Sequence, residues 1–174
     1  MKTASVLLFL SICLSFTQCT KKNKLDSYHY FQDFEAVKNW YPKTLTTNQI
    51  LARSGTYSAY TDSSEPYSPT LTVKCAEFPK MPKKIKASAW CYLSSDKCGG
   101  SFCFNLYSPK NESKQWVDVN LKEAIQTVGK WTKVTIEKEI DEKALAPENS
   151  ISVFVWNTQK ERIFIDDVEV EFVE

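Results

Sequence analysis

The chain has 174 residues, with 22 basic against 21 acidic side chains, and 13% of its residues are aromatic. This length and aromatic content fit one globular domain with a core of ordinary size. Nucleic-acid binding requires a clustered excess of Lys and Arg, and the near-neutral balance excludes that class of protein.

Residues 1–18 predict a lipoprotein signal peptide. Lys2 supplies a basic start, and residues 4–16 form an apolar segment that is too short to span a bilayer. The segment ends at Cys19 and resembles the lipobox of bacterial lipoproteins, in which this cysteine is lipidated and becomes the first residue of the mature protein. A plain secretory signal is the alternative, and both place the mature chain outside the cytoplasm.

Residues 19–27 are polar and basic, which predicts a tether between a lipid anchor and a folded domain at residues 28–174. The N-terminus is like that of Bacteroidetes lipoproteins, so we expect an outer-membrane location. The basic residues after the cysteine, Lys21, Lys22 and Lys24, do not resemble the acidic surface-export signal of such lipoproteins. Whether the protein lies on the cell surface or on the periplasmic face of the outer membrane is therefore left open.

From Tyr28 onward the sequence predicts short strands and no convincing helix. The expected strands are 28–35, 49–53, 56–61, 70–75, 84–93, 101–107, 115–121, 131–140, 151–157 and 164–172. Residues 141–146 precede Pro147 and predict at most one helical turn. Many short strands at this spacing are typical of a β-sandwich.

The last expected strand contains one anomalous residue. By simple alternation Asp166 falls on the same face as Phe164, Val168 and Val170. A carboxylate on an apolar face is costly unless it is paired, hydrogen-bonded or bound to a cation. The strand therefore either helps to hold an ion or bulges at Asp166.

Several short motifs follow one another in an order that resembles a known family. They are Phe34-Glu35, Trp40, and residues 53–58, 86–90, 129–134 and 164–168. Their order resembles the jelly-roll carbohydrate-binding modules attached to xylanases and β-glucanases, over residues 30–173. The resemblance implies an all-β, galactose-binding-like jelly-roll sandwich of two antiparallel sheets. The same fold also hosts structural and protein-binding domains.

The resemblance further implies a structural calcium ion at one edge of the sandwich. By position its ligands are Glu35, backbone oxygens of the loop at Ser54 and Gly55, and Asp166, with Asp33 and Asp167 as substitutes. Calcium accepts such mixtures of carboxylate and carbonyl oxygens. The alternative is that Asp166 accepts hydrogen bonds from backbone amides at a bulge. Zinc does not suit a chain whose one histidine is His29.

Modules of this family bind polysaccharides through aromatic side chains that stack on sugar rings, beside polar groups that bind the hydroxyls. Alternation puts Trp116 on one face of its strand with Asp118 and Asn120, and puts Asn105 on one face with Tyr107. The candidate glycan-binding residues are Asn105, Tyr107, Trp116, Asp118, Asn120, Trp156 and, in a loop, Trp40. We expect Trp90 in the core and Trp131 in a packing role.

Four cysteines remain if Cys13 is removed and Cys19 is lipidated, and an exported protein favours disulfides among them. They are Cys75, Cys91, Cys98 and Cys103, which allow three pairings. A hairpin of residues 84–93 and 101–107 would place Cys91 opposite Cys103 and leave Cys75 for Cys98.

No set of nucleophile, histidine and acid is available, and no phosphate-binding glycine loop occurs, so we expect no catalysis. Acidic residues are numerous enough for a two-carboxylate glycosidase, but one small sandwich makes this a poor fit. The expected function is a non-catalytic, glycan-binding envelope lipoprotein. The alternative is a structural or protein-interaction domain of the same fold that contacts other envelope proteins.

Overall fold

The computed structural model describes residues 27–35 and 47–174. The expected signal peptide and tether, with Cys19, and the loop residue Trp40 lie outside the described residues, so what we expect of them stays a prediction. Within the described ranges, no helix is both long and apolar enough to cross a membrane.

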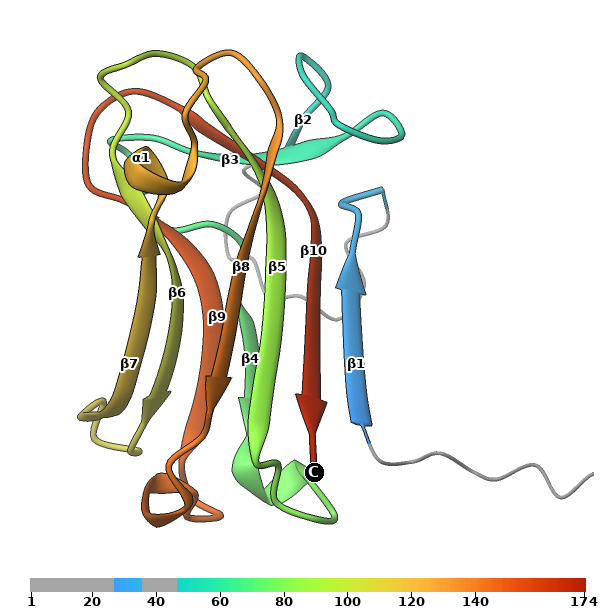
Figure 1. Cartoon of the computed structure of the whole chain (residues 1–174), viewed down its shortest axis with the longest axis vertical. Helices are drawn as coiled ribbons and strands as arrows, with labels where there is room; N and C mark the ends of the chain where they lie inside the picture. Colours follow the sequence, from blue (N-terminus) through green and yellow to red (C-terminus); the bar gives the residue numbers. More distant parts are fainter. Residues whose placement is uncertain (1–26, 36–46) are drawn as a thin grey trace, which may run out of the picture.

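Strand β10 (Ile163–Val173) lies at the centre of the larger sheet (Figure 1). It pairs antiparallel along one edge with β5 (Lys84–Leu93). Along its other edge, its first residues pair with β3 (Ser58–Thr61) and its last residues with β1 (Ser27–Gln32). The closing strand therefore connects the beginning, middle and end of the chain in one sheet.

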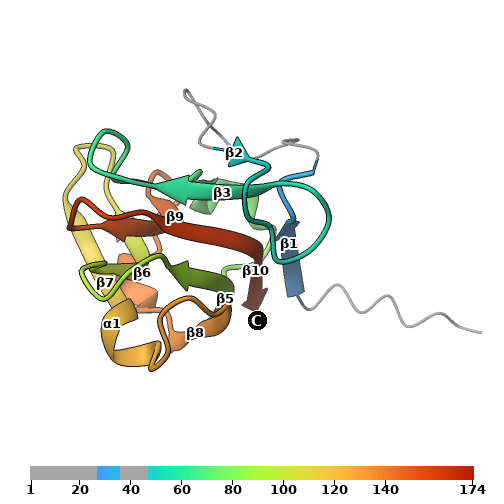
Figure 2. The same cartoon turned by 90° about the horizontal axis from the view of Figure 1, so that it is seen from above.

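The described chain forms two antiparallel sheets packed face to face (Figures 1 and 2). The larger sheet has the order β2-β3-β10-β5-β8, with β1 also on β10, and the smaller has the order β4-β9-β6-β7. The remaining strands are β2 (Thr47–Asn48), β4 (Leu71–Lys74), β6 (Gly100–Tyr107), β7 (Ser113–Asn120), β8 (Thr132–Glu139) and β9 (Ser150–Asn157). The predicted β-sandwich of two antiparallel sheets is confirmed.

Apolar residues at alternate strand positions fill the space between the sheets. The fully buried ones include, from the smaller sheet, Phe104, Leu106 and Val153 and, from the larger sheet, Ile85, Ile165 and Phe172. Because one face of each strand is used in this way, the alternate residues of the same strands stand on the outer faces of the sandwich.

Strand β10 changes its facing at a β-bulge between Asp166 and Glu169. Ile165 belongs to the core before the bulge and Val168 after it, although the two are an odd number of residues apart. Asp167 has a φ of 43°, which provides the local kink. Asp166 therefore does not share a face with Val168, as simple alternation predicted, and the bulge anticipated at this position is present.

Two details of the expected secondary structure were wrong. Residues 49–53 form no strand, because the side-chain oxygen of Asn48 accepts hydrogen bonds from the amides of Ile50 and Leu51 and turns the chain. One turn of helix, α1 (Leu121–Ala124), follows β7, and the side chain of Asn120 caps it by accepting the amide of Lys122. The short 3-10 turn at Glu142–Ala144 agrees with the single turn predicted there.

Candidate functional site

The outer face of the smaller sheet brings most of the predicted glycan-binding residues together. Asn105 on β6 lies opposite Trp116 on β7, and Ser101 on β6 lies opposite Trp156 on β9. Asp118 lies opposite Cys103, one position along β7 from Trp116 on the same face. Three neighbouring strands thus present these side chains on one surface.

Four aromatic rings form a closed group on this face, which we call the aromatic cluster: Tyr67, Trp116, Phe154 and Trp156. The ring centroids of Trp116 and Trp156 are 6.4 Å apart and nearly perpendicular, and Tyr67 stacks on Trp156 at 6.4 Å with an angle of 11° between the planes. Phe154 contacts both Tyr67 and Trp116, at 5.7 and 6.0 Å. These spacings are those of favourable aromatic pairs.

The aromatic cluster remains open to solvent. Tyr67 is 53% exposed, Trp116 43% and Trp156 37%. Three large exposed rings in contact with one another form an apolar patch, and such patches on soluble domains are typical of binding surfaces. Both faces of residues 153–158 carry large or apolar side chains, so alternation does not decide the facing of Trp156; the structure shows that it is outward.

Two of the predicted polar residues already bind groups of the protein. Asp118 accepts a hydrogen bond from the indole nitrogen of Trp116 at 3.0 Å, which fixes the orientation of that ring. Asn120 uses its side-chain oxygen to cap α1 through the amide of Lys122. These contacts give Asp118 a positioning role and Asn120 a structural one, whatever further contacts they make.

A hollow of about 280 Å³ adjoins the aromatic cluster, and we call it the neutral pocket because no charged residue lines it. Its lining includes Tyr67, Thr70, Asn105, Tyr107, Ser152 and Phe154. By contrast, a groove on the outer face of the larger sheet is lined by Lys86, Lys133, Glu169 and other charged groups. Sequence reasoning found Asn105 and Tyr107 but missed Tyr67 and Phe154.

The outer face of the larger sheet carries Trp90, which we had expected in the core. The residues on either side of it in the sequence, Ala89 and Cys91, are buried instead, because they lie on the face of β5 that packs against the other sheet. The Arg53 guanidinium covers the Trp90 ring at 4.0 Å from the ring centroid. Trp131 packs against Tyr92 at 5.6 Å, which is the packing role expected of it.

Asp166 lies beneath the loop that contains Gly55. One carboxylate oxygen of Asp166 accepts hydrogen bonds from the amides of Arg53 and Ser54, at 2.8 and 3.2 Å. The other accepts the amide of Asp167 at 2.8 Å. Asp166 is fully buried, and the hydrogen bonds from these three amides replace those that its carboxylate would accept from water.

Glu35, three residues after the end of β1, binds the same loop. Its Oε1 accepts hydrogen bonds from the amides of Thr56 and Tyr57, each at 2.7 Å. A Cβ atom on Gly55 would lie 2.4 Å from this oxygen, and Gly55 has a φ of 59°. Both facts require glycine at this position.

These contacts do not fit a calcium site. The loop directs amide N–H groups at the carboxylates of Glu35 and Asp166, whereas calcium would need its carbonyl oxygens. The Arg53 guanidinium also lies 2.6 Å from Asp167, where it supplies positive charge. Asp33 accepts the amide of Glu35. Within residues 27–35 and 47–174, no three His, Cys, Asp or Glu side chains are grouped as a metal would require.

Calcium binding itself is untested, and the contacts favour the alternative of amide hydrogen bonds at a bulge. We expect the melting temperature to be the same in excess calcium and in excess chelator, because backbone amides already satisfy the carboxylates. A thermal melt in the two buffers measures this. A melting temperature that rises with calcium and falls with chelator would contradict the hydrogen-bonded account.

Burial raises the pKa of Asp166 to about 6, although three amide hydrogen bonds act in the opposite direction. The folded protein therefore binds this proton more tightly than the unfolded chain does, whose aspartate titrates near pH 4. The contribution of Asp166 to stability is greatest below pH 4 and is lost as the pH rises to about 6. Asp166→Asn lacks this titration.

We therefore expect Asp166→Asn to gain stability relative to the wild type as the pH rises from 4 to 7. Urea denaturation of both proteins at intervals across this range measures the difference. A stability difference that stays constant with pH would show that Asp166 titrates alike in the folded and unfolded chain.

The disulfide prediction was wrong: Cys75, Cys91, Cys98 and Cys103 are all buried and unpaired. β5 and β6 do not form a hairpin, because they lie in different sheets. Cys91 is in the core, whereas Cys103 lies on the outer side of β6 beside Phe154. β4 and β6 both run antiparallel to β9, so Cys75 after β4 and Cys98 before β6 lie at opposite ends of the sandwich.

Burial raises the pKa of the Cys91 and Cys103 thiols to about 12 each and raises that of Cys75. Thiols react as thiolates, so the native protein should react with a thiol reagent many times more slowly than the protein in denaturant. A thiol titration in buffer and in denaturant measures this. A disulfide-linked peptide in a mass spectrum of unreduced digests would contradict it.

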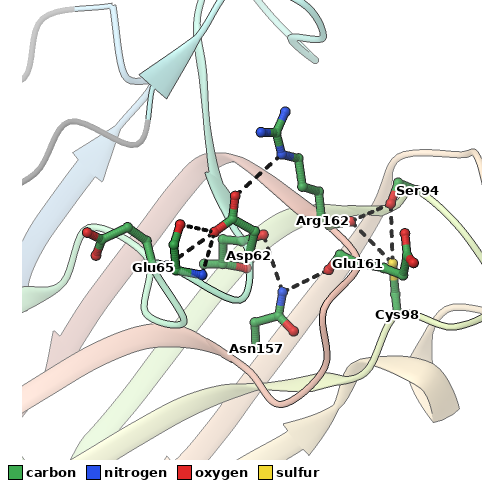
Figure 3. Close-up of polar contacts among 9 residues, drawn as sticks. Asp62, Glu65, Ser94, Cys98, Asn157, Glu161 and Arg162 are labelled. Carbon is green, nitrogen blue, oxygen red and sulfur yellow. Dashed lines mark hydrogen bonds and ion pairs between the residues drawn. The ribbon is translucent and has the colours of Figure 1, made fainter.

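A polar network joins three loops at one end of the sandwich (Figure 3). The carbonyl oxygen of Arg162 accepts the hydroxyl of Ser94 at 2.7 Å and the thiol of Cys98 at 3.2 Å. Asp62 faces the Arg162 guanidinium at 3.5 Å, and hydrogen bonds from Ser64, its hydroxyl foremost, lower the pKa of Asp62. These contacts hold together the loops that follow β3 and β5 and the loop that precedes β10.

No protein-family profile and no curated protein sequence matches this chain. Solved structures do. The second CBM22 xylan-binding domain of Paenibacillus barcinonensis Xyn10C matches with a TM-score of 0.58 at 13% identity, over 83% of this chain and 99% of that domain.

The C-terminal family 22 carbohydrate-binding module of Clostridium thermocellum Xyn10B matches with a TM-score of 0.55 at 14% identity, over 83% of this chain and 91% of that one. A xylan-binding CBM22 domain formerly called x6b matches with a TM-score of 0.53 at 12% identity, over 84% of this chain and 93% of that one. The chain therefore has the same β-sandwich fold as these modules. At such identities the likeness concerns the fold, and the site must be argued from its own residues.

Proposed function

We propose that this protein is a non-catalytic glycan-binding module that uses the outer face of its smaller sheet. The observation that carries the proposal is the joint exposure of Trp116 and Trp156 in one aromatic cluster. Sugar rings have apolar C–H faces, and exposed indole rings provide flat apolar surfaces to stack on them. Solved modules of this fold that are described as xylan-binding support the same use of the fold.

The polar residues of the face suit the same ligand. Asn105, Tyr107 and Ser152 stand beside the rings and offer amide and hydroxyl groups to sugar hydroxyls. Retaining and inverting glycosidases commonly need two carboxyl groups about 5 to 9.5 Å apart. Strands β4, β6, β7 and β9 present one carboxylate on this face, Asp118, and it is bound to the indole of Trp116.

The proposal includes the cellular setting expected from the N-terminus. Cleavage before Cys19, a lipid on that cysteine and the tether of residues 19–27 would hold the module at the outer membrane of a Bacteroidetes-like bacterium. Such a module would keep a polysaccharide, or a glycan-bearing surface, close to the envelope.

Affinity electrophoresis against a panel of soluble polysaccharides tests the proposal. The purified protein should be retarded by at least one polysaccharide, and Phe31→Ala should be retarded equally, because Phe31 is an exposed aromatic residue on the other sheet. A protein retarded by no glycan would contradict glycan binding and would favour a protein partner for the aromatic cluster.

A further inference from the structure

The neutral pocket and the aromatic cluster share two side chains, Tyr67 and Phe154. A ligand stacked on Trp116 or Trp156 can therefore continue across Phe154 into the pocket without leaving the protein surface. The cluster and the pocket form one continuous binding surface with two chemically different parts.

The polar groups of the neutral pocket are already oriented. The side-chain oxygen of Asn105 accepts the hydroxyl of Ser113 at 2.7 Å, which leaves its amide nitrogen available to donate. The hydroxyl of Tyr107 accepts that of Ser152 at 3.3 Å and keeps its own proton to donate. Both groups can donate to sugar hydroxyls, and neither carries a charge.

Tyr67 forms one wall of the pocket, and backbone bonds to β9 hold it from both sides. The amide of Asn157 donates to the carbonyl of Pro66 at 2.7 Å. The amide of Ser68 donates to the carbonyl of Val155 at 2.9 Å, and the hydroxyl of Ser68 accepts the amide of Val155 at 2.9 Å. We call these three hydrogen bonds the clamp, and they hold Tyr67 where its ring stacks parallel on Trp156.

The side chain of Asn157 extends the clamp to the neighbouring loops (Figure 3). Its amide nitrogen donates to the carbonyl of Thr61 at 3.3 Å and to that of Glu161 at 2.9 Å. Asn157 is 3% exposed, so these bonds are shielded from water. The segment that carries Tyr67 is thus ordered before any ligand arrives, which lowers the entropy lost on binding.

We propose that the neutral pocket is a second sugar subsite beside the tryptophan pair, that it takes an uncharged sugar ring, and that Asn157 is a positioning residue for its wall, Tyr67. The inference rests on the proposed function. A uronate or sulfated ring would lose hydration in this pocket and meet no opposite charge, so acidic glycans should be excluded from it.

The test is calorimetric titration with neutral oligosaccharides of one to six units, from xylan, cellulose and mannan, and with oligogalacturonides. Wild-type affinity should increase with length as the second subsite fills. Asn105→Ala should weaken binding of the longer neutral oligosaccharides about tenfold and leave the shortest ligand that binds unchanged. Tyr67→Ala also removes the ring that stacks on Trp156, so it should weaken binding at every length and weaken the longer oligosaccharides about tenfold more than the shortest. Trp156→Ala should weaken binding at every length.

Asn157 is tested by a double-mutant cycle with Tyr67. Asn157→Ala should cause the same length-dependent loss as Tyr67→Ala and no further loss in the Tyr67→Ala background. If Asn157 acted only on general stability, Asn157→Ala would weaken oligosaccharide binding equally in the wild type and in Tyr67→Ala. If Asn157→Ala does not fold, Ser68→Ala, which removes the hydroxyl bound to Val155, takes its place in the cycle.

The outcomes separate the two proposals. If Asn105→Ala and Tyr67→Ala bind every length like the wild type while Trp156→Ala fails, the second subsite is overturned and glycan binding stands. Oligogalacturonides that bind as tightly as neutral ligands overturn the uncharged class. A wild type that binds no oligosaccharide in the series overturns both.

Discussion

Asp166→Ala is expected to destabilise the protein by about 2–5 kcal/mol, since an unsatisfied buried donor costs about 1–3 kcal/mol. The substitution leaves the amides of Arg53, Ser54 and Asp167 without their acceptor. For a domain of this size the melting temperature should fall by about 5–15 °C. Thermal and urea denaturation at pH 7 measure both quantities.

Asp166→Asn is the matched variant, because its side-chain oxygen can still accept the amides of Arg53 and Ser54. We expect it to lose less stability than Asp166→Ala. Equal losses in the two variants would show that the negative charge, and not the acceptor geometry, is what the loop requires. Wild-type stability in Asp166→Ala would contradict the account of the bulge.

Trp156→Ala and Trp116→Ala are each expected to weaken glycan binding about thirtyfold or more, because aromatic side chains that a ligand covers on binding can contribute about 2 kcal/mol or more. Trp156 contacts two other rings of the aromatic cluster, and its loss also removes the surface on which Tyr67 stacks. Titration of each variant with a bound oligosaccharide measures the loss, and a thermal melt shows whether the fold is kept.

The control for this pair is Phe31→Ala, which removes an exposed ring from the other sheet and should leave affinity unchanged. Variants at Trp116 and Trp156 that keep wild-type affinity, in a protein that does bind a glycan, would move the site away from the smaller sheet.

The fold followed from sequence because strand alternation is a local property. Val117 and Val119 against Trp116 and Asp118 indicated one inward and one outward face, and the register of β6 with β7 has this arrangement. Alternation misled only where the backbone departs from a regular strand. The bulge after Asp166 reverses the facing of every later residue in β10, and sequence reasoning had to leave the bulge as one of two readings.

Trp90 and the cysteines show a second limit. Alternation separates the two faces of a strand but does not show which face is inward. The inward face of β5 carries small residues, so it does not stand out as the core face by size. Residue size suggested the core for Trp90, while Ala89 and Cys91 are the residues that fit between the sheets. The disulfide pairing failed because it assumed that consecutive strands are neighbours, whereas β5 and β6 are split between the two sheets.

The residues of the candidate site that lie in strands could be named from the sequence, whereas Tyr67, which lies in a loop, could not. Trp116 occupies a regular strand position opposite Asn105, and the polar residues that alternate with it indicated its outward face, whereas alternation did not decide the facing of Trp156. Tyr67 joins them through the hydrogen bonds of its neighbours to β9, nearly 90 residues further along the chain. A local sequence pattern contains no signal for such a contact.

The most direct test of glycan binding on this face is to follow the indole N–H signals by NMR while a bound oligosaccharide is added, with each signal assigned by a Trp→Phe variant. The signals of Trp116 and Trp156 should move, while those of Trp90, on the other sheet, and Trp131, which packs against Tyr92 of that sheet, should stay in place. The signal of Trp40 tests the prediction for that residue. Shifts confined to Trp90 and Trp131 would contradict the account of the smaller sheet.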